Sequence, residues 1–275
     1  MAIDNKAIVA IPSHRRAETL ESCALAFLDR VGFPRSRVFV FVSDGTDRAA
    51  YQHITGINLV YDRDIGSLRE KFNFIRRYFE IDQRIFLMED DVVSIVEKTG
   101  ENKSVEVTRF QAFLDEGFSL MESARARIWG VSPHSNAFYM TNDNSLNLKF
   151  IVAHAFGMLA DREERRDITL DGKSDYERTI LYYLADGKTP RLNRFGVKAI
   201  DSYKGKGGLQ AEFGSAERRE REEKSVRYLI TRYSLLCYEN KTKKSIMPEI
   251  KLRQVKSPHS HVVQQQQKLE RSLGY

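Results

Sequence analysis

The sequence has little of what marks secreted, membrane or zinc-finger proteins. Its 275 residues include only two cysteines, Cys23 and Cys237, which lie far apart and lack the close spacing of metal-ligand pairs. Such cysteines predict free buried thiols in a reducing cytoplasm. No apolar run approaches the ~20 residues that a membrane-spanning helix needs. The first residues lack the basic-then-apolar layout of a signal peptide. We therefore expect a cytoplasmic protein without a membrane partner.

What remains is the composition of an ordinary globular chain. Hydrophobic residues make up 41% of the sequence and charged residues 30%, which is usual for a folded domain. A chain of this length can bury a substantial core. The formal net charge is +6. A basic balance permits a phosphate-rich partner such as a nucleic acid, but it does not establish one.

The most informative stretch is an apolar segment that ends in three carboxylates. Residues 84–88 predict a fully buried strand, because polar and apolar side chains do not alternate there. Glu89, Asp90 and Asp91 follow at the carboxyl end, where ligands bind in open α/β sheets. Adjacent carboxylates repel one another unless a cation lies among them, and Mg²⁺ and Mn²⁺ prefer carboxylate and phosphate oxygens. The stretch predicts a metal–diphosphate site, although alone it fits an acidic turn equally well.

Three earlier segments also predict strands, and helices lie between them. Strands are expected over 6–11, 37–42 and 58–61, and helices over 17–31 and 47–53. This alternation is typical of a parallel sheet covered by helices. The polar residues that follow the four strands are Ser13 to Arg16, Asp44, Asp62 to Asp64 and Glu89 to Asp91. Four strands that bring polar groups to one edge are more specific for a ligand site than any one of them.

Two of the predicted helices begin where an anion would be favoured. Ser13 is expected to cap the first helix, beside Arg15 and Arg16, although solvated arginines would give the same pattern. Gly66 opens an amphipathic helix on which Arg69 and Asn73 lie four residues apart. Residues at this spacing share one helix face, here near the helix start, where the dipole favours negative charge.

Residues 1–95 resemble the nucleotide-sugar-binding half of GT-A-fold glycosyltransferases. The resemblance implies a Rossmann-like α/β fold with a mostly parallel sheet, a divalent Mn²⁺ or Mg²⁺, and a nucleotide-diphospho-sugar donor, for which we expect a UDP-sugar. The residues that carry it are Pro12, Ser13, His14 and Arg15 after the first strand, Asp44 after the second, Asp62 after the third, the Gly66, Arg69 and Asn73 pattern, and the triplet Glu89, Asp90 and Asp91. The triplet departs from the Asp-x-Asp form of the family motif.

Roles follow from this resemblance residue by residue. Asp44 and Asp62 would lie around the nucleoside, and the Gly66 helix beside the diphosphate. Asp91 would touch the metal, while Glu89 or Asp90 would approach the ribose.

The acceptor half is expected to follow in residues 96–210. The predicted elements are a turn over 99–104, a helix over 109–123, and strands over 128–131, 148–159 and 192–200. Trp129 fits the core or a stacking role. His154, inside the long strand, fits a core histidine better than a ligand, and Gly157 would allow close approach of a sugar.

Asp175 is the candidate general base. Ser174 and Glu177 have the spacing of a capping box, so the bland interpretation is a capped helix with no chemical role. An inverting sugar transfer needs a carboxylate that takes the proton of the acceptor hydroxyl. The GT-A resemblance places such a carboxylate near the start of a helix after the acceptor-side strand. Asp175 matches that position, and Glu177 and Asp171 are the reserves.

The last third of the chain is basic, and residues 211–275 are expected to form a helical or irregular extension with a frayed tail. A glycine-rich basic loop precedes it, with Lys204 and Lys206 as candidate phosphate contacts. The loop lacks the ending of a P-loop, and a plain linker would look the same. Lys251 and Arg253 are further candidates for DNA contact. By resemblance, His259 or His261 is a late metal ligand, a pattern that a surface tail would also give.

The combined motifs resemble the TET/JBP-associated glycosyltransferases of bacteriophages. That resemblance implies transfer of a sugar to the hydroxymethyl group of a modified pyrimidine in DNA. Binding would then weaken steeply with salt, and the base would be flipped out to reach Asp175. The alternatives are a GT-A enzyme with a protein, lipid or glycan acceptor, a nucleotidyltransferase, and a nucleotide- or nucleic-acid-binding module without turnover.

Overall fold

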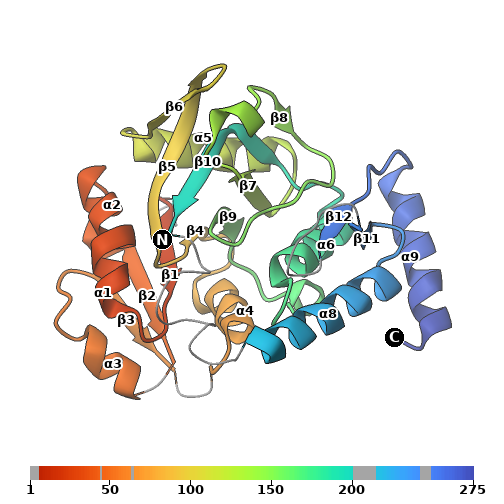
Figure 1. Cartoon of the computed structure of the whole chain (residues 1–275), viewed down its shortest axis with the longest axis horizontal. Helices are drawn as coiled ribbons and strands as arrows, with labels where there is room; N and C mark the ends of the chain where they lie inside the picture. Colours follow the sequence, from red (N-terminus) through yellow and green to blue (C-terminus); the bar gives the residue numbers. More distant parts are fainter. Residues whose placement is uncertain (1–5, 44, 63–64, 201–214, 242–248) are drawn as a thin grey trace.

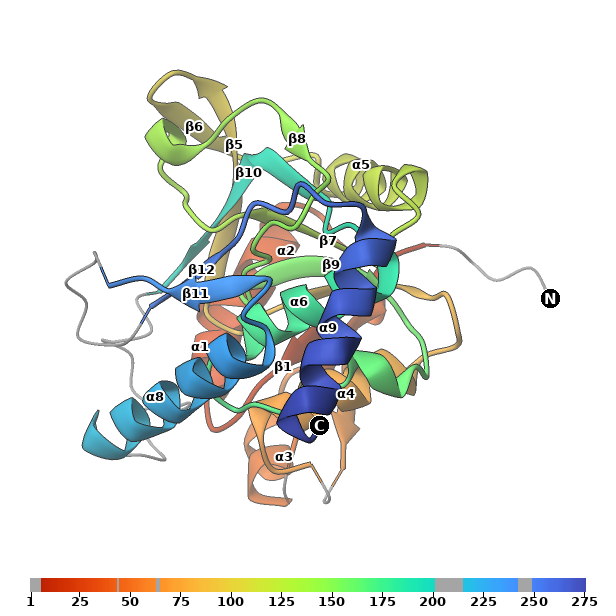
Figure 2. The same ribbon diagram turned by 90° about the vertical axis from the view of Figure 1, so that its right-hand side faces the viewer.

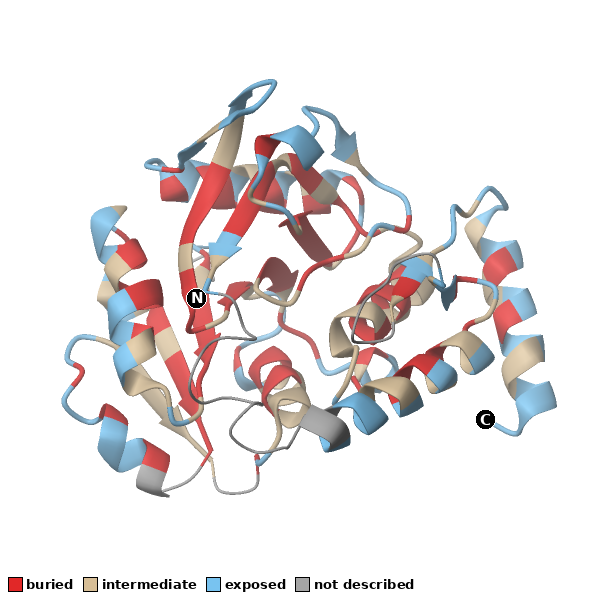
Figure 3. Ribbon diagram, viewed as in Figure 1, coloured by how far each residue is buried: buried red, intermediate tan, exposed pale blue. Residues whose placement is uncertain are grey.

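A ten-stranded sheet runs through the centre of the molecule (Figure 1). The computed structural model describes residues 6–43, 45–62, 65–200, 215–241 and 249–275. The strand order is β3-β2-β1-β4-β9-β7-β10-β5-β6, and β8 pairs with β10. The central strands are almost wholly buried, whereas the tip of the hairpin formed by β5 and β6 is exposed (Figure 3).

The first half of the sheet is parallel. It contains β1 (Ile8–Pro12), β2 (Val38–Val42), β3 (Asn58–Tyr61) and β4 (Arg84–Met88). The apolar runs that predicted these strands fill both faces of the sheet, as expected for a parallel sheet covered by helices. Because the strands are parallel, their carboxyl ends meet at one edge. The predicted α/β order is confirmed.

The second half of the sheet is mostly antiparallel. Its strands are β5 (Val92–Gly100), β6 (Lys103–Glu106), β7 (Ile128–Ser132), β8 (Asn144–Ser145), β9 (Ala155–Leu159) and β10 (Arg191–Ala199). β9 runs antiparallel to both β4 and β7, and β5 runs antiparallel to β10. The turn expected over 99–104 is shorter than predicted, because β5 and β6 extend to Gly100 and from Lys103.

The long strand expected over 148–159 is also wrong, because only Ala155–Leu159 is a strand. The preceding residues are held by side-chain hydroxyls instead of a strand ladder. Lys149 N donates to Thr189 Oγ1 at 2.8 Å, and Ile151 N donates to Thr179 Oγ1 at 3.1 Å. Apolar composition alone does not reveal that hydroxyl groups, and not a neighbouring strand, accept the backbone hydrogen bonds of this segment.

Helices cover both faces of the sheet. One face packs against α1 (Ala17–Leu20), a π-helical turn (Glu21–Leu25), α2 (Ala26–Arg30) and α5 (Phe110–Ser123). The other face packs against α4 (Leu68–Tyr78) and α6 (Ser174–Asp186). The shorter helices are α3 (Gly45–Tyr51), η2 (Arg35–Arg37), η3 (Ala137–Tyr139) and η4 (Glu164–Arg166).

The sequence suggested that Gly157 allows the close approach of a sugar. In the structure, the space beside Gly157 is occupied by Trp129. A Cβ at Gly157 would lie 1.9 Å from Trp129 Nε1, and one at Gly117 would lie 2.3 Å from the same indole. Trp129 is fully buried between these two backbones, against Phe86 and Phe113. The tryptophan is therefore a core residue.

The C-terminal extension packs on α6 (Figure 2). It consists of α8 (Ser215–Arg232), the hairpin of β11 (Cys237–Glu239) and β12 (Ile250–Leu252), and α9 (His259–Leu273). The tail that we expected to be frayed forms α9, where Gln266 is buried and donates to Arg232 O at 2.7 Å. None of the helices in the described part of the chain is long and apolar enough to cross a membrane.

Candidate functional site

The acidic triplet forms a tight turn between β4 and β5, and His154 lies beside it. Because β9 pairs antiparallel with β4, with Met88 opposite Ala155, the next residues outward are Glu89 and His154. Glu89 N donates to His154 O at 3.0 Å, and His154 Nε2 lies 3.5 Å from Glu89 Oε2. One ligand atom from each of Glu89, Asp91 and His154 lies within 4.8 Å of the others.

This cluster has the donor set of a divalent metal site. Asp91 is buried, and its Oδ1 has no hydrogen-bond partner among the described residues. Burial raises the pKa of Glu89, and the carboxylates of Asp91 and Asp175 raise it further, while His154 and Arg178 oppose them. Carboxylate oxygens suit Mg²⁺ and Mn²⁺, whereas an imidazole favours a transition metal, so of these two ions the cluster fits Mn²⁺ better. A bound cation would offset the repulsion between Glu89 and the neighbouring carboxylates, which contributes to the raised pKa of Glu89.

Asp90 is not part of this cluster and belongs to a closed ring of hydrogen bonds. Arg16 N donates to Tyr51 Oη at 3.0 Å, Tyr51 Oη lies 2.6 Å from Ser13 Oγ, and Ser13 Oγ donates to Asp90 Oδ2 at 2.6 Å. Arg16 Nη1 lies 3.0 Å from Asp90 Oδ1 and closes the ring. Since the single Ser13 proton goes to Asp90, Tyr51 must donate to Ser13. The position of Ser13 predicted a helix cap. Its hydroxyl instead belongs to this ring, and the N-cap of α1 is Arg16.

Arg16 also contacts Asp91, with Nη2 at 3.2 Å from Oδ2. One guanidinium thus bridges two adjacent carboxylates of the turn. Burial raises the pKa of Asp90 to about 7, against the opposing effects of Arg16 and Ser13. Burial likewise raises the pKa of Tyr51 to about 12. Asp90 is therefore a buried part of the scaffold, held by Arg16 and Ser13.

The loop after β1 is fastened by Asp47 of α3. Asp47 is buried, its Oδ1 accepts from Arg15 N at 2.9 Å, and its Oδ2 lies 2.6 Å from His14 Nδ1. Arg15 adopts a left-handed backbone conformation, with φ of 54°, which non-glycine residues seldom adopt. This conformation turns the loop so that Arg16 meets the carboxylates.

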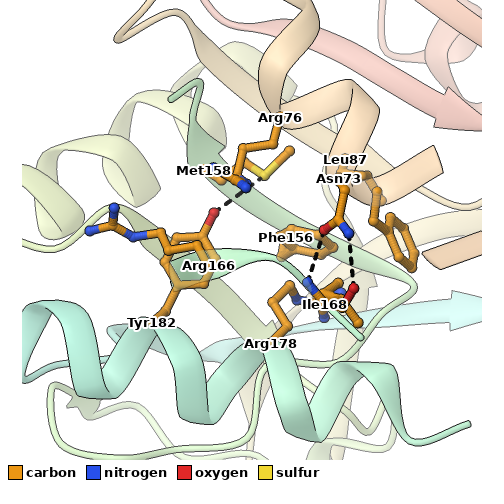
Figure 4. Close-up of a pocket in the computed structure, with 10 residues that line it drawn as sticks. Asn73, Arg76, Leu87, Phe156, Met158, Arg166, Ile168, Arg178 and Tyr182 are labelled. Atoms are coloured by element: carbon orange, nitrogen blue, oxygen red, sulfur yellow. Dashed lines mark hydrogen bonds between the residues drawn. The ribbon is translucent and has the colours of Figure 1, made fainter. Parts of the chain in front are cut away.

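The predicted shared face of Arg69 and Asn73 exists, and it contacts the segment that leads to α6. Asn73 exchanges two hydrogen bonds with the backbone of Ile168, both 2.9 Å long (Figure 4). Arg69 Nη1 donates to Thr169 O at 2.8 Å, and its Nε lies 3.3 Å from Asp171 Oδ1. At the start of α4, Ser67 and Glu70 form a capping box, and Glu70 also accepts from Gly66 N. This face of α4 thus connects the two halves of the sheet domain.

On α6, Glu177 has a structural role, and Asp175 lies within electrostatic reach of Glu89 in the acidic turn. The capping box expected of Ser174 and Glu177 is absent, because the helix begins at Ser174 and its N-cap is Lys173. Glu177 instead accepts from Thr169 N, Thr169 Oγ1 and Leu170 N at 2.6 to 2.8 Å, and it is fully buried. Burial raises the pKa of Asp175, whereas Arg178 and Lys173 lower it.

Arg178 is a buried cation that interacts electrostatically with both Asp175 and Glu89. Its guanidinium lies 3.8 Å from the ring centre of Phe156, and its Nη2 donates to Ile151 O at 3.0 Å. Burial lowers the pKa of Arg178 to about 10, and the negative charges of Asp175 and Glu89 oppose this shift. Arg178 also lines a cavity of about 10 Å³, room for roughly one water molecule, between α4, α6 and the sheet (Figure 4).

Comparison with solved structures identifies the fold. No family model matches the sequence, and no curated protein matches it either. The crystal structure of S. aureus TarS 1-349 aligns with a TM-score of 0.51 and 11% identity, over 97% of this chain and 72% of that chain. The complex of the same TarS fragment with UDP-GlcNAc aligns with a TM-score of 0.50 and 11% identity, over 97% and 73%. The fold is the GT-A glycosyltransferase fold.

Within this GT-A fold, the late histidines lie away from the acidic turn. His259 Nε2 lies 3.1 Å from Leu184 O, near the carboxyl end of α6, and its ring packs on Tyr183. His261 Nε2 lies 2.8 Å from Gln265 Nε2. Asp175 and Leu184 are nine residues apart on α6, which corresponds to ~13 Å along a helix. His154 is therefore the histidine that the structure brings to Glu89 and Asp91.

Three of the remaining predicted residues, Asp62, Lys251 and Arg253, lie in the described part of the chain. Asp62 follows β3, with its N–H 3.4 Å from Val42 O. Lys251 is exposed on β12, and Arg253 is exposed just after it. Ile250 accepts a hydrogen bond from Tyr176 Oη at 2.9 Å, so β12 adjoins the start of α6. Asp44, Lys204 and Lys206 lie outside the described residues.

The sequence pointed to an anion as the partner of Arg16 and to a core role for His154, and it assigned no role to Arg178, whereas the structure places Arg16 on two carboxylates and His154 in the metal cluster. A polar histidine inside an apolar run was the available signal for His154, but its significance depends on which strand pairs with β4. Arg16 carried the same loop signal as Arg15, and only the backbone turn at Arg15 decides which arginine meets the carboxylates. Arg178 gave no signal beyond its place three residues after Asp175.

Proposed function

We propose that this chain is a divalent-metal-dependent glycosyltransferase with a nucleotide-diphospho-sugar as donor. The observation that carries the proposal is the cluster of Glu89, Asp91 and His154, placed after β4 at the edge where the parallel strands of a GT-A fold end. Ligands bind at this edge in open α/β sheets. Mn²⁺ or Mg²⁺ in the cluster would supply Lewis-acid stabilisation of the departing diphosphate.

We assign the donor to the surface formed by the ends of β1 to β4. The loop of Pro12, Ser13, His14 and Arg15 and the start of α4 at Gly66 and Arg69 border it, with Asn73 supporting α4 from behind. Arg15 and Arg69 are the cations for the diphosphate, and Asp44 and Asp62 are the groups for the nucleoside. The similar TarS structure binds UDP-GlcNAc, which favours a UDP-sugar here.

Asp175 is the proposed general base. It lies close enough to Glu89 for their charges to interact, and its pKa is raised by burial. A raised pKa brings a carboxylate closer to the operating pH and makes it a better proton acceptor. In this role Asp175 takes the proton of the acceptor hydroxyl while that oxygen attacks the sugar. Arg178 below it holds positive charge near both Asp175 and Glu89.

For the acceptor we propose the hydroxymethyl group of a modified pyrimidine in DNA. Lys251 and Arg253 are exposed beside the start of α6, so a phosphate backbone that contacts them would lie near Asp175. The net charge of +6 has the sign required. The motifs at Ser13, Gly66 and Glu89 resemble those of phage enzymes that act on such bases.

The first test is mass spectrometry of nucleosides from treated DNA. DNA with 5-hydroxymethylcytosine or 5-hydroxymethyluracil is incubated with the protein, Mn²⁺ and several UDP-sugars, and release of UDP is followed in parallel. A hexose or N-acetylhexosamine mass increment is the expected result. UDP release without a DNA adduct would point to a protein, lipid or glycan acceptor, and release of pyrophosphate to nucleotidyl transfer. Nucleotide binding without turnover would indicate a binding module.

Asp91→Asn is the matched control for this assay. It replaces one oxygen of the metal cluster by nitrogen at almost constant volume. We expect metal-dependent turnover to disappear while circular dichroism and thermal unfolding remain those of a folded protein. Full activity of this variant would contradict the assignment of the metal site.

A further inference from the structure

The bridge that Arg16 makes between Asp90 and Asp91 has a consequence for metal binding. Glu89, Asp90 and Asp91 bring three carboxylates to one turn. Arg16 is the cation in direct contact with two of them, Asp90 and Asp91. Its side chain is 16% exposed, so solvent screens these contacts only partly. Arg16 therefore neutralises part of the charge that would attract a metal.

The geometry leaves each oxygen of Asp91 with a different partner. Oδ2 accepts from Arg16 Nη2, whereas Oδ1 is the buried oxygen without a hydrogen-bond partner in the described part of the chain. The ring through Tyr51, Ser13 and Asp90 fixes the guanidinium from the other side. Arg16 and a metal ion would therefore bind to opposite oxygens of one carboxylate and repel each other.

We propose that Arg16 is a built-in counter-cation that weakens the binding of free divalent metal to the acidic turn. It holds the carboxylates of Asp90 and Asp91 together between turnovers and lowers the affinity of the turn for metal alone. The negative charges of a donor diphosphate then make up the difference, so that metal is taken up and released together with the nucleotide. This inference rests on the proposed function of the Glu89, Asp91 and His154 cluster.

The test measures Mn²⁺ affinity by electron paramagnetic resonance, without donor or acceptor. Arg16→Met removes the charge. We expect the Mn²⁺ affinity of this variant to be at least about tenfold higher than that of wild type, because one repulsive unit charge is lost. Arg16→Lys keeps a positive charge, and its affinity should remain close to that of wild type. Arg109→Met removes the same charge from an exposed position before α5, and it should leave the affinity unchanged.

A thermal measurement supports the same comparison. Saturating Mn²⁺ should raise the melting temperature of Arg16→Met more than that of wild type, because tighter ligand binding stabilises the folded state more. Arg16→Gln removes the charge but keeps an amide donor toward Asp90, and it replaces Arg16→Met if that variant does not fold.

Two outcomes overturn the inference, and they are distinguishable. If the uncharged Arg16 variants bind Mn²⁺ no more tightly than wild type, Arg16 does not act as a counter-cation, and the proposed metal site stands. If Asp91→Asn leaves the Mn²⁺ affinity of wild type unchanged, the metal binds elsewhere. In that case the inference and the proposed metal-dependent function both fall.

Discussion

Asp175 and Glu177 lie two residues apart at the start of α6, yet their surroundings assign them different roles. Glu177 is saturated by three donors from Thr169 and Leu170 and has no contact with solvent. Asp175 accepts one backbone hydrogen bond, from Tyr176, and lies within electrostatic reach of Glu89. The carboxylate of Glu177 fastens a loop, and that of Asp175 is close enough to the candidate site to interact with Glu89.

Replacement of each carboxylate by its amide should separate these roles. Asp175→Asn should lower kcat by about 10²–10⁴-fold with little change in the free energy of unfolding. Glu177→Gln should lower the free energy of unfolding by about 1–3 kcal/mol, because a buried donor loses its partner. UDP-release kinetics and urea unfolding measure the two quantities. Wild-type kcat in Asp175→Asn would exclude it as the base.

Gly157 makes a second prediction at the scale of one residue. A Cβ there would overlap the indole of Trp129, which is fully buried and cannot move aside. Gly157→Ala should therefore destabilise the protein by about 1–3 kcal/mol or more. Gly100→Ala is the control, because its Cβ would meet Lys103 at an ordinary 3.6 Å. Equal unfolding midpoints for the two variants would contradict the packing described for Trp129.

At the scale of elements, the junction of α8 and β11 buries an ionisable thiol. Cys237 is 1% exposed, and its Sγ lies 3.3 Å from Leu229 O. Burial raises the pKa of this thiol from 9.0 to about 12. Between these values the folded state holds a proton that the unfolded state releases. The stability that the neutral thiol contributes is therefore complete below pH 9 and is lost as the pH rises toward 12.

Comparison with Cys237→Ala isolates this effect from other alkaline titrations. The difference in free energy of unfolding between wild type and variant should be constant below pH 9. Above it, the wild type should lose up to about 1.4 kcal/mol per pH unit relative to the variant. Urea unfolding at pH 7, 9, 10 and 11 measures the difference. Parallel pH profiles would show that the thiol is not held in a protonated state.

Pairing of elements also decides the metal cluster. Glu89 and Asp91 follow β4, whereas His154 precedes β9 and lies more than sixty positions further along the chain. The antiparallel ladder of β4 and β9 places them side by side. The position of the carboxylates was predictable, because acidic residues that directly follow an apolar strand must lie at its carboxyl end. The histidine was not, because the partner strand of β4 is not written in local sequence.

At the scale of the whole molecule, the proposed DNA acceptor implies a strong dependence on salt. Each phosphate contact adds roughly 0.9 to the slope of log affinity against log salt concentration. Lys251→Gln should therefore weaken binding equally for all DNA sequences and reduce this slope by about one. Lys268→Gln, in an exposed position on α9, should change neither quantity. An unchanged slope in Lys251→Gln would remove β12 from the DNA-binding surface.

Local sequence patterns were enough to predict the parallel half of the fold and the edge at which its polar groups gather. Short apolar runs, each followed by polar residues and a helix, leave few other arrangements, since strands and helices have distinct periods and parallel strands need helical crossovers. The same local patterns predicted the common face of Arg69 and Asn73 and the helix that carries Asp175.

Which side chains meet depended on how the chain packs in three dimensions. It placed His154, and not His259 or His261, beside Glu89 and Asp91, and it turned Arg16, and not Arg15, toward the carboxylates. The antiparallel half of the sheet was mispredicted at 148–159 for the same reason, because hydroxyls distant in sequence satisfy that backbone. Contacts between residues far apart in the chain depend on packing and register, and local composition encodes neither.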